Sequence, residues 1–505
     1  MSVAITRGIS LTGLEGEVIN IEVDVSHGLP GYQLLGLPDA ALNEARDRIR
    51  SAINNSGKRW PATKITVSLS PAWLPKSGSG FDLPISVAIL RATQQVPDID
   101  LSETILIGEL SLDGYLRPIR GLLPMLLAAE KHGMRRAVVP EANLSEARIV
   151  SQLEIIPATS LAQVLAIISG AEIPRHIPLM ESEVDLPTVD FAEVAGQENA
   201  KWGLEIAATG GHHILMMGPP GTGKTMLAER LPTILPPLGD DQLRDVAAIH
   251  SIAGTSQIAT ILRRTPPYIA PHHTTTSAGM VGGGTKSIRP GACSLSHHGV
   301  LFIDEAPECA SGILDSLRQP LESGFIEITR AIGTTKFPAR FMLVLAANPC
   351  PCGRFSGKGR SCQCSSLQVR RYLNRLSGPL LDRIDVKLRV ENPTRAELAS
   401  NELRETSAVI RARVESARAV ANERFKGFGF QLNSAIPSEL LRTKFRAHSK
   451  AMSALHILIE QEEITARGFH KILRLAWTIA DLRGTSVPGV EEIDMALSLR
   501  TETSH

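Results

Sequence analysis

The sequence predicts a multidomain protein of the α/β class, and three observations support this prediction. The chain has 505 residues, which at about 150 residues per domain allows two to four domains. Its texture changes from a mixed α+β block, through alternating apolar strands and helices, to a block that is helical in period. A glycine-rich loop stands between a strand and a helix in the middle block, as in phosphate-binding folds.

The changes in texture also predict the domain boundaries. We expect an α+β domain over residues 1–170, a linker rich in Pro and Glu over 171–189, an α/β core over 190–392 and a helical C-terminal domain over 393–505. The periodicity of the last block predicts helices over 395–420, 437–445, 450–462, 466–482 and 489–498.

Composition excludes several classes of protein. Lys and Arg total 53 and Asp and Glu total 52, so no global basic excess drives binding to nucleic acid or to a membrane. The chain contains no run of 18 apolar residues, no secretory signal and only six cysteines, four of them within 350–364. We therefore expect a soluble cytoplasmic protein without a membrane partner.

The glycine-rich loop follows the apolar run 214–217 and satisfies the pattern G-x-x-x-x-G-K-[ST]. Its residues are Gly218, Pro219, Pro220, Gly221, Thr222, Gly223, Lys224 and Thr225. Glycines let the backbone N–H groups wrap a phosphate closely, and the helix that follows adds a favourable dipole for anions. We expect ATP as the ligand, with Lys224 neutralising its terminal phosphates and the Thr225 hydroxyl binding Mg²⁺. A chance glycine-rich turn is the alternative.

Two later strand ends complete a hydrolysis site. The apolar run 300–303 ends in Asp304, expected to bind Mg²⁺, and in Glu305, expected to polarise the attacking water. The apolar run 341–347 ends in Asn348, which is placed to orient that water. Without the phosphate loop, the two acids could equally be a solvated strand end.

Two arginines could stabilise charge on the terminal phosphate. Arg383, within residues 377–385, is a candidate arginine finger. Its alternative role is an ion pair with Asp382 or Asp385, and the nearby Arg371 and Arg375 compete with it as fingers. Arg467 opens a C-terminal helix and could reach the nucleotide from there, or lie on the helix surface.

Together these residues resemble the AAA+ superfamily, in its magnesium-chelatase-like branch and within that the ComM/YifB family. The motifs that carry the resemblance are APHHTTTSAGMVGGGTKSIRPGACSLSHHGVLFIDE (270–305), AANPCPCG (346–353) and SGPLLDRID (377–385). The resemblance implies a homo-hexameric ring in which Arg383 acts in trans. It also implies a helicase acting on single-stranded or branched DNA, promoting branch migration during recombination and natural transformation.

Two segments of the core are unusually basic. Between Asp245 and Asp304 there is no acidic residue, whereas Arg263, Arg264, Lys286 and Arg289 all occur there. A hairpin predicted over 325–337 carries Arg330 and Lys336. Such segments are suited to contact phosphates, with surface loops that touch no substrate as the alternative.

The N-terminal block resembles the C-terminal domain of Lon protease over residues 62–141. On this alignment the nucleophilic serine falls at Gly80 and the catalytic lysine at Leu123, so the Ser–Lys dyad is absent. Ser77, Ser79 and Lys76 lie nearby and leave a rearranged dyad as the alternative.

Four cysteines follow Asn348 in the pattern C-x-C-x₉-C-x-C: Cys350, Cys352, Cys362 and Cys364. Four thiolates on one loop suit a structural Zn²⁺ site, although the usual spacing is C-x₂-C, and unliganded thiols are the alternative. Residues 350–376 contain six basic side chains and no acid, which suits either a DNA backbone or an acidic neighbouring subunit.

Two functions are therefore compared. The first is a ring-shaped, ATP-driven DNA translocase, supported by the basic segments and by the family resemblance. The second is a chaperone-like ATPase that remodels a protein or a chelatase-type partner. An ATP-dependent protease is excluded because Gly80 and Leu123 replace the dyad.

Overall fold

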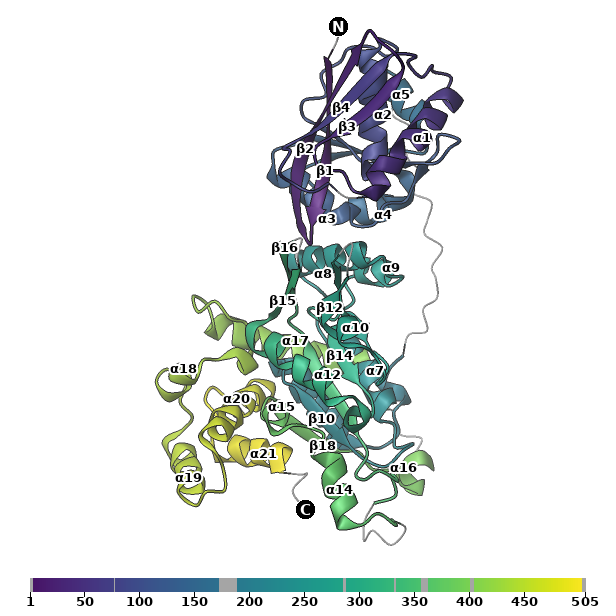
Figure 1. Ribbon diagram of the computed structural model, residues 1–505. Helices are drawn as coiled ribbons and strands as arrows, with labels where there is room; N and C mark the ends of the chain where they lie inside the picture. The colour runs from purple at the N-terminus through teal and green to yellow at the C-terminus, as the bar shows by residue number, and fades with distance from the viewer. Residues whose placement is uncertain are drawn as a thin grey trace. The chain divides into compact units, whose positions relative to one another are not determined.

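The structure is a computed structural model that describes residues 3–76, 78–171, 189–284, 288–330, 333–355, 362–399 and 404–501 (Figure 1). The chain forms two compact units. Unit 1 comprises Met1–Val184, Asp240–Arg263 and Thr329–Phe337, and unit 2 comprises Asp185–Gly239, Arg264–Ile328 and Pro338–His505. The predicted linker over 171–189 lies outside the described residues except for residues 171 and 189.

Unit 1 is an α+β structure built on two sheets. The first has the strand order β1-β2-β4-β3, in which β1 and β2 and β2 and β4 are antiparallel and β3 is parallel to β4. The second is parallel, with the order β5-β8-β9, and β6 and β7 form a short ladder. The strands are β1 (Val3–Thr12), β2 (Glu15–Ser26), β3 (Gly31–Leu35), β4 (Lys64–Ser70), β5 (Thr104–Leu106), β6 (Glu109–Leu110), β7 (Leu116–Arg117), β8 (Arg136–Pro140) and β9 (Glu154–Ala158).

Unit 1 also contains several helices. They are α1 (Ala40–Asn55), α2 (Asp82–Ala92), α3 (Leu122–Lys131), α4 (Leu144–Ala147), α5 (Leu161–Ile168), α8 (Asp240–Ala253) and α9 (Ile258–Leu262). α2 is buried at ten of its eleven positions, because it is almost wholly apolar and lies between α1 and the first sheet. α8 comes from the predicted ATPase core, yet it packs on α3.

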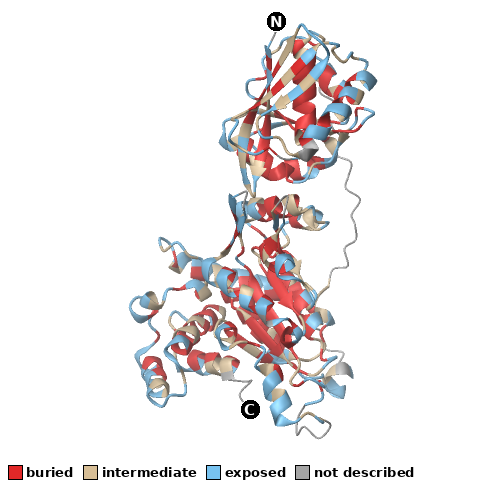
Figure 2. Cartoon of the chain, in the orientation of Figure 1, coloured by how far each residue is buried: buried red, intermediate tan, exposed pale blue. Residues whose placement is uncertain are grey.

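Unit 2 is organised around a parallel sheet with the order β11-β14-β17-β10-β18. Its strands are β10 (Ile214–Met217), β11 (Tyr268–Ile269), β14 (Val300–Ile303), β17 (Met342–Ala347) and β18 (Val386–Arg389). β14 and β17 are buried along their whole length, as Figure 2 shows, because helices lie on both faces of a parallel sheet. Their sequences are accordingly continuous apolar runs rather than alternating ones.

The helices of unit 2 precede, interrupt and follow the sheet. They are α6 (Glu198–Gly210), α7 (Lys224–Ile234), α10 (Ser277–Val281), α11 (Ala292–Leu295), α12 (Ser311–Ser316), α13 (Arg318–Ser323), α14 (Ser366–Leu373), α15 (Gly378–Leu381), α16 (Arg395–Ala399), α17 (Ser407–Arg424), α18 (Ser438–Arg442), α19 (Ser449–Glu460), α20 (Ala466–Arg483) and α21 (Val490–Thr501). Two short ladders are inserted, β12 (Gly282–Gly283) with β13 (Arg289–Pro290), and β15 (Phe325–Arg330) with β16 (Gly333–Pro338).

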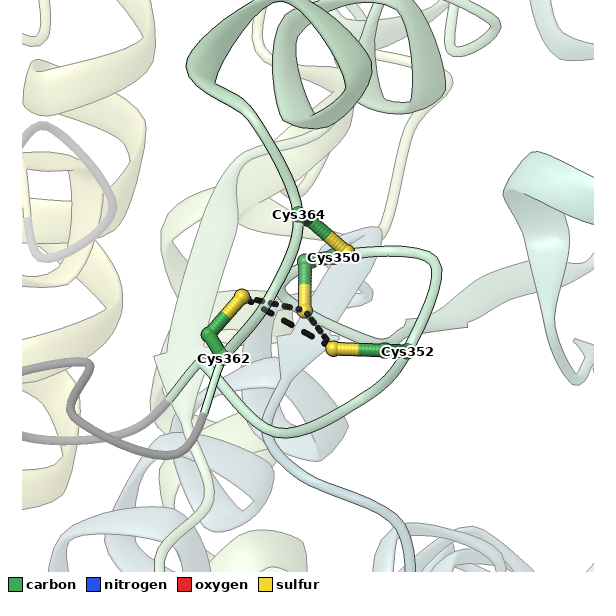
Figure 3. A group of neighbouring side chains, drawn as sticks. All are labelled: Cys350, Cys352, Cys362 and Cys364. Carbon is green, nitrogen blue, oxygen red and sulfur yellow. Dashed lines mark hydrogen bonds between the residues drawn. The ribbon is translucent and has the colours of Figure 1, made fainter.

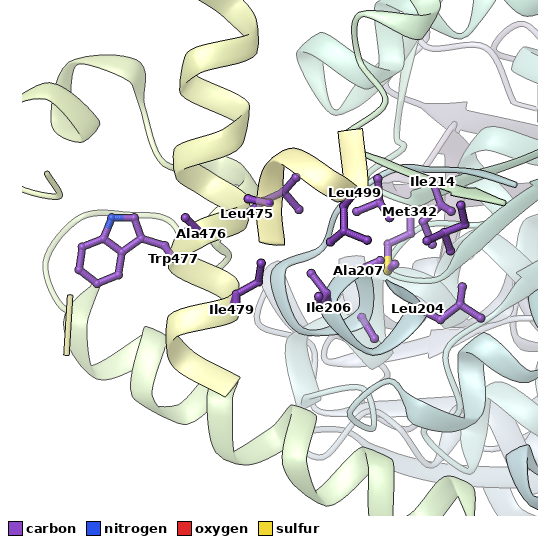
Figure 4. Packing of buried hydrophobic residues seen from close by; sticks show 14 of the residues in the cluster. Leu204, Ile206, Ala207, Ile214, Met342, Leu475, Ala476, Trp477, Ile479 and Leu499 are labelled. Atoms are coloured by element: carbon purple, nitrogen blue, oxygen red, sulfur yellow. The ribbon is translucent and has the colours of Figure 1, made fainter. Parts of the chain in front are cut away.

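One hydrophobic core joins the sheet of unit 2 to the C-terminal helices. Leu475 and Ile479 on α20 and Leu499 on α21 belong to the same cluster as Ile206 on α6 and Ile214 on β10 (Figure 4). The C-terminal helices therefore do not fold around a separate core, and their position relative to the sheet is set by direct packing.

A buried polar network crosses the same contact. The Asp385 carboxylate lies 3.1 Å from Nδ1 of His212 and 2.8 Å from the Lys471 ammonium, and Nε2 of His212 lies 2.8 Å from the Thr478 hydroxyl. Burial disfavours the charge of Asp385, but Lys471 and His212 outweigh it and hold the pKa of this carboxyl well below its usual range. The network ties the segment that carries Arg383 to α20.

The predicted fold class is confirmed: an α/β core with a helical C-terminal region follows an α+β block. The predicted helices of the last block are found, with the first of them divided into α16 and α17. The boundaries at 170, 190 and 392 stay predictions.

Candidate functional site

The phosphate loop begins where β10 ends and is closed by α7. Gly221 and Gly223 have φ angles of +79° and +88°, which are accessible to glycine at little cost. A Cβ at Gly218 would lie 2.1 Å from the carbonyl oxygen of Val390, so this position also requires glycine. The Thr222 hydroxyl donates to the Pro219 carbonyl at 2.9 Å and holds the loop together.

Lys224 is the first residue of α7 and is only 7% exposed. Its ammonium donates to the carbonyl oxygens of Gly218 at 2.7 Å and Pro219 at 2.9 Å, and to Oδ1 of Asn348 at 3.2 Å. Burial lowers the pKa of Lys224, whereas the charges of Asp304 and Glu305 oppose this shift. The ammonium is therefore satisfied by three oxygens that converge at the ends of β10 and β17.

Thr225 and Asp304 form the second contact of the site. The Thr225 hydroxyl donates to Oδ2 of Asp304 at 2.9 Å, and Oδ1 of Asp304 accepts the backbone N–H of Glu305 at 2.8 Å. Hydroxyl and carboxylate oxygens are the ligands that Mg²⁺ prefers. The donor set thus fits a magnesium ion beside the phosphate loop, with Thr225 and Asp304 as the residues that would hold it.

The order of the sheet explains why these residues meet. β14, β17 and β10 are neighbours and parallel, so their carboxyl ends lie at one edge. Asp304 follows β14, Asn348 follows β17, and the phosphate loop follows β10. Crevices at the carboxyl ends of parallel strands are the usual ligand sites of α/β folds.

Glu305 has a contact that the sequence did not predict. Its backbone is left-handed, with φ of +48°, and its carboxylate lies 3.3 Å from Nδ1 of His273. His273 belongs to the segment after β11, which pairs with β14, so the two residues extend from neighbouring strands. The sequence held one indication of the contact between Glu305 and His273, which is the His-His pair at 272–273 near a strand end.

A contact of Gln197 was also not predicted: its side-chain amide donates to the Thr222 carbonyl at 2.7 Å and braces the phosphate loop.

The two predicted arginines lie next to each other but make no hydrogen bond or ion pair with the phosphate loop among the described residues. Arg383 pairs with Glu322 and donates to the Pro379 carbonyl, and Arg467 pairs with Asp382 at 2.7 Å. The alternative expectation for Arg383, an ion pair with Asp382 or Asp385, is wrong because Glu322 reaches it from α13.

The competing arginines differ from Arg383 in their surroundings. Arg375 donates to the Pro307 carbonyl at 3.1 Å and pairs with Glu308 at 3.2 Å, so it braces the turn after Glu305. Arg371 is exposed on α14. The choice of finger stays a prediction.

The four cysteines of the loop after Asn348 come together (Figure 3). Their sulfur atoms all lie within 4.8 Å of one another. The separations are 3.4 Å between Cys350 and Cys352, 3.7 Å between Cys352 and Cys362, and 3.7 Å between Cys350 and Cys362. The backbone N–H of Arg354 and the neighbouring thiols lower the pKa of Cys352 to about 6. Backbone N–H donors lower the pKa of Cys362 and Cys364, but burial and the neighbouring thiols outweigh them and raise it, so the thiolate is favoured at Cys352 and not at Cys362 or Cys364.

The basic segments are partly described. Arg263, Arg289, Arg330, Lys336, Arg370 and Arg371 are exposed. Lys286, Lys358 and Arg360 lie outside the described residues. In the described part, exposed cations thus occur on β13, on the β15–β16 hairpin and on α14, the helix that follows the cysteines.

The structure describes both positions of unit 1 that are aligned with the Lon dyad. Gly80 lies in the short turn before α2, and Leu123 is fully buried on α3, where its N–H donates to the Ser251 hydroxyl. Lys76 is buried, and its ammonium donates to the Pro71 carbonyl. Ser77 and the side chain of Ser79 lie outside the described residues, so the rearranged dyad is not tested.

Three protein-family models match the chain. The model described as magnesium chelatase, subunit ChlI, matches residues 190–398. The model described as subunit ChlI of Mg-chelatase matches residues 21–143, and the model of the ChlI C-terminal region matches residues 404–500.

Relatives match along almost the whole chain. An uncharacterised protein of Mycobacterium tuberculosis is 44% identical over 493 residues, which cover 97% of each chain. The competence protein ComM of Haemophilus influenzae is 40% identical over 494 residues, 96% of this chain and 94% of ComM. The uncharacterised protein YifB of Escherichia coli is 38% identical over 501 residues, 99% of this chain and 97% of YifB.

A more distant similarity covers only part of the chain. The Lon protease of Mycolicibacterium smegmatis is 26% identical over 174 residues, 32% of this chain and 22% of Lon, in the N-terminal part. Within the described residues, no helix has the length and apolar character needed to cross a membrane.

Two substitutions separate nucleotide binding from hydrolysis. Lys224→Ala removes the ammonium at the loop, and we expect it to abolish ATP binding. Glu305→Gln keeps the shape of the side chain but removes its charge, and we expect ATP binding to persist while turnover falls about 100-fold or more. Equilibrium binding and steady-state turnover of both variants check this. Equal turnover in Glu305→Gln and the parent protein would remove Glu305 from its role.

Proposed function

Since this chain belongs to the magnesium-chelatase-like AAA+ family that includes ComM and YifB, we propose that it is a ring-forming ATPase that moves DNA. The proposed action is that of a helicase promoting branch migration during homologous recombination, in particular of DNA taken up in natural transformation. The name of the relative ComM, a competence protein, supports a role in competence, and the alignment covers 94% of that protein. The proposed ring is a homo-hexamer.

The ATPase part of the proposal depends on one observation: Lys224 donates a hydrogen bond to Asn348, and the next residue, Thr225, donates one to Asp304. The phosphate loop and Lys224 would bind the phosphates of ATP. Mg²⁺, held by Thr225 and Asp304, would neutralise charge on them. These are the groups that nucleotide hydrolysis needs at one place.

Glu305 and Asn348 are the proposed groups for the chemical step. Glu305 accepts a proton from a water molecule, whose oxygen attacks the terminal phosphorus as the bond to the bridging oxygen breaks, which gives ADP and phosphate. The amide of Asn348 orients that water. His273 lies 3.3 Å from one carboxylate oxygen of Glu305, and the other oxygen of this carboxylate can accept the proton.

Arg383 is the proposed finger on the neighbouring subunit's ATP. Within its own chain Arg383 pairs with Glu322 on α13, and in the described part of the chain it makes no hydrogen bond or ion pair with the phosphate loop, which supports an action in trans. The Arg383 side chain is 17% exposed, whereas the Glu322 side chain is 66% exposed. Contact with a neighbouring subunit can therefore move Glu322 away from Arg383 more readily than it can move Arg383. Arg467, paired with Asp382 beside it, is the proposed second cation.

The DNA part of the proposal is supported by where the exposed cations lie. Arg289 on β13, Arg330 at the end of β15, and Arg370 and Arg371 on α14 come from segments that lack acidic side chains or carry few. Cations of this kind bind phosphates without reading sequence. We propose single-stranded or branched DNA as the ligand.

A protein-remodelling ATPase is the second candidate. It is favoured by the family models, which describe a subunit of magnesium chelatase. Stimulation of ATP turnover by a protein partner, together with indifference to DNA, would distinguish it.

DNA should raise the rate of ATP turnover. We expect forked or Holliday-junction DNA to stimulate turnover, and the apparent DNA affinity to fall about tenfold or more between about 50 and 200 mM salt, because bound counterions are released. Steady-state ATPase assays at two salt concentrations measure this, with Lys224→Ala as the control. A rate that no form of DNA changes would shift the proposal to the second candidate.

Mixed rings test the action of Arg383 in trans. Arg383→Ala and Glu305→Gln should each lose about 100-fold or more of the turnover rate. A mixture of the two should regain activity, because an intact site on one subunit then meets an intact Arg383 on its neighbour.

The matched control mixes Glu305→Gln with Asn348→Ala. Both changes fall in the same half of the site, so every site keeps one defect and no recovery is expected. Recovery in neither mixture would place Arg383 in the site of its own subunit.

A further inference from the structure

The loop that follows Asn348 returns to Asn348. Cys350 lies two residues beyond Asn348 and is fully buried. After the described part of the loop resumes at Cys362, Ser365 caps α14, and Gln368 returns the hydrogen bond in a capping box. One turn later on α14, Tyr372 is hydrogen-bonded to the backbone of Asn348. Both ends of the cysteine loop therefore meet at the residue placed to orient the attacking water.

The same loop lies against the phosphate loop. Gly353 has φ of +70°, and a Cβ there would lie 2.5 Å from Cγ of Pro220. No side chain fits between the two loops at this point. A displacement of the cysteine loop would consequently disturb both Pro220 and Asn348.

The arrangement of the sulfur atoms is that of metal ligands. Four sulfurs at Zn–S distances of about 2.3 Å on a tetrahedron are about 3.8 Å apart. Three of the sulfur separations in the cluster are 3.4 to 3.7 Å, and all four atoms lie within 4.8 Å of one another. Disulfide sulfurs are about 2.05 Å apart, so the cluster is not a pair of disulfides. Four thiols in a loop of few apolar side chains gain little from one another by packing alone.

We propose that Cys350, Cys352, Cys362 and Cys364 hold one Zn²⁺ ion, which closes the loop and thereby positions Asn348 and Pro220 for ATP hydrolysis. The effect on hydrolysis depends on the proposed function, whereas the metal site does not. An all-thiolate tetrahedral set is typical of structural zinc, since soft ligands select it and leave no open position. The four cysteines act as positioning residues because their proposed effect on hydrolysis passes through Asn348 and Pro220.

The charge around the site suits this ion. Four thiolates and one Zn²⁺ carry a net double negative charge, and residues 350–376 contain basic side chains but no acid. Arg354 contributes its backbone N–H to Cys352. Nearby cations and N–H donors to sulfur stabilise such an anionic centre.

The first experiment measures metal and thiols in the purified full-length protein. We expect about one equivalent of zinc per chain by elemental mass spectrometry, and release of that zinc to a metal indicator as a thiol reagent modifies the four cluster cysteines of the six. Metal-free protein, or iron in place of zinc, would overturn the assignment. This outcome does not depend on ATP turnover.

The second experiment compares Cys352→Ala and Cys364→Ala with the control Cys293→Ala, which removes a buried cysteine outside the cluster. The cluster variants should lose zinc, keep ATP affinity within about threefold and lose about tenfold or more of kcat, while the control changes none of these. Combining Cys352→Ala with Asn348→Ala should cost less than the sum of the two single losses, since part of the effect of Cys352→Ala passes through Asn348.

Two further outcomes are decisive. We expect a chelator applied to the folded parent protein to reproduce the loss of kcat without any substitution. This experiment tests the proposal even if the cysteine variants fail to fold. Unchanged turnover after complete loss of zinc would overturn the positioning role. A parent protein that holds zinc but hydrolyses no ATP would contradict the proposed function and leave the metal site standing.

Discussion

The structure of the candidate site depends on the burial of one ammonium group. Lys224 is almost inaccessible to water, and a buried charge is tolerated only when hydrogen-bonding partners replace its hydration. Two of its partners are carbonyls of its own loop and the third is the amide of Asn348, 124 residues further on. The ammonium therefore couples the phosphate loop to the end of a neighbouring strand. The same parallel sheet carries Asp304 to the Thr225 hydroxyl, so strand order, rather than proximity in sequence, assembles the site.

The remaining parts of unit 2 maintain this arrangement. The helices α20 and α21 share one hydrophobic core with the sheet, and the Asp385 network joins them to the segment that carries Arg383. His213 strengthens the same region: burial lowers its pKa to about 4, and its neutral ring accepts the N–H of Leu343 at the start of β17. Buried contacts thus join α20, which carries Arg467, to the segment that carries Arg383.

Local patterns in the sequence predicted the parts of the site that local chemistry determines. The strand over Ile214–Met217 and the helix after the loop are confirmed, because apolar runs and the glycine pattern specify them directly.

Contacts between distant segments could not be predicted in this way. The partner of Arg383 is Glu322 rather than Asp382 or Asp385, and Glu305 faces His273, because both contacts depend on how neighbouring strands and helices pack. The packing of α8 on α3 in unit 1 has no local signal either, since an amphipathic helix does not specify which surface will cover it. The spacing of the cysteines indicated a metal site, but not that the loop contacts Pro220.

The central claim is that Thr225 and Asp304, from two different strand ends, form one Mg²⁺ site beside the phosphate loop. The most direct test is the Mg²⁺-dependent part of ATP affinity in Thr225→Ala, Asp304→Ala and the double variant. Two ligands of one ion should each remove most of that dependence, and the double variant should lose no more than about the larger single loss. Losses that add in full, or an unchanged dependence on Mg²⁺ in either single variant, would contradict the claim that these two residues share one ion.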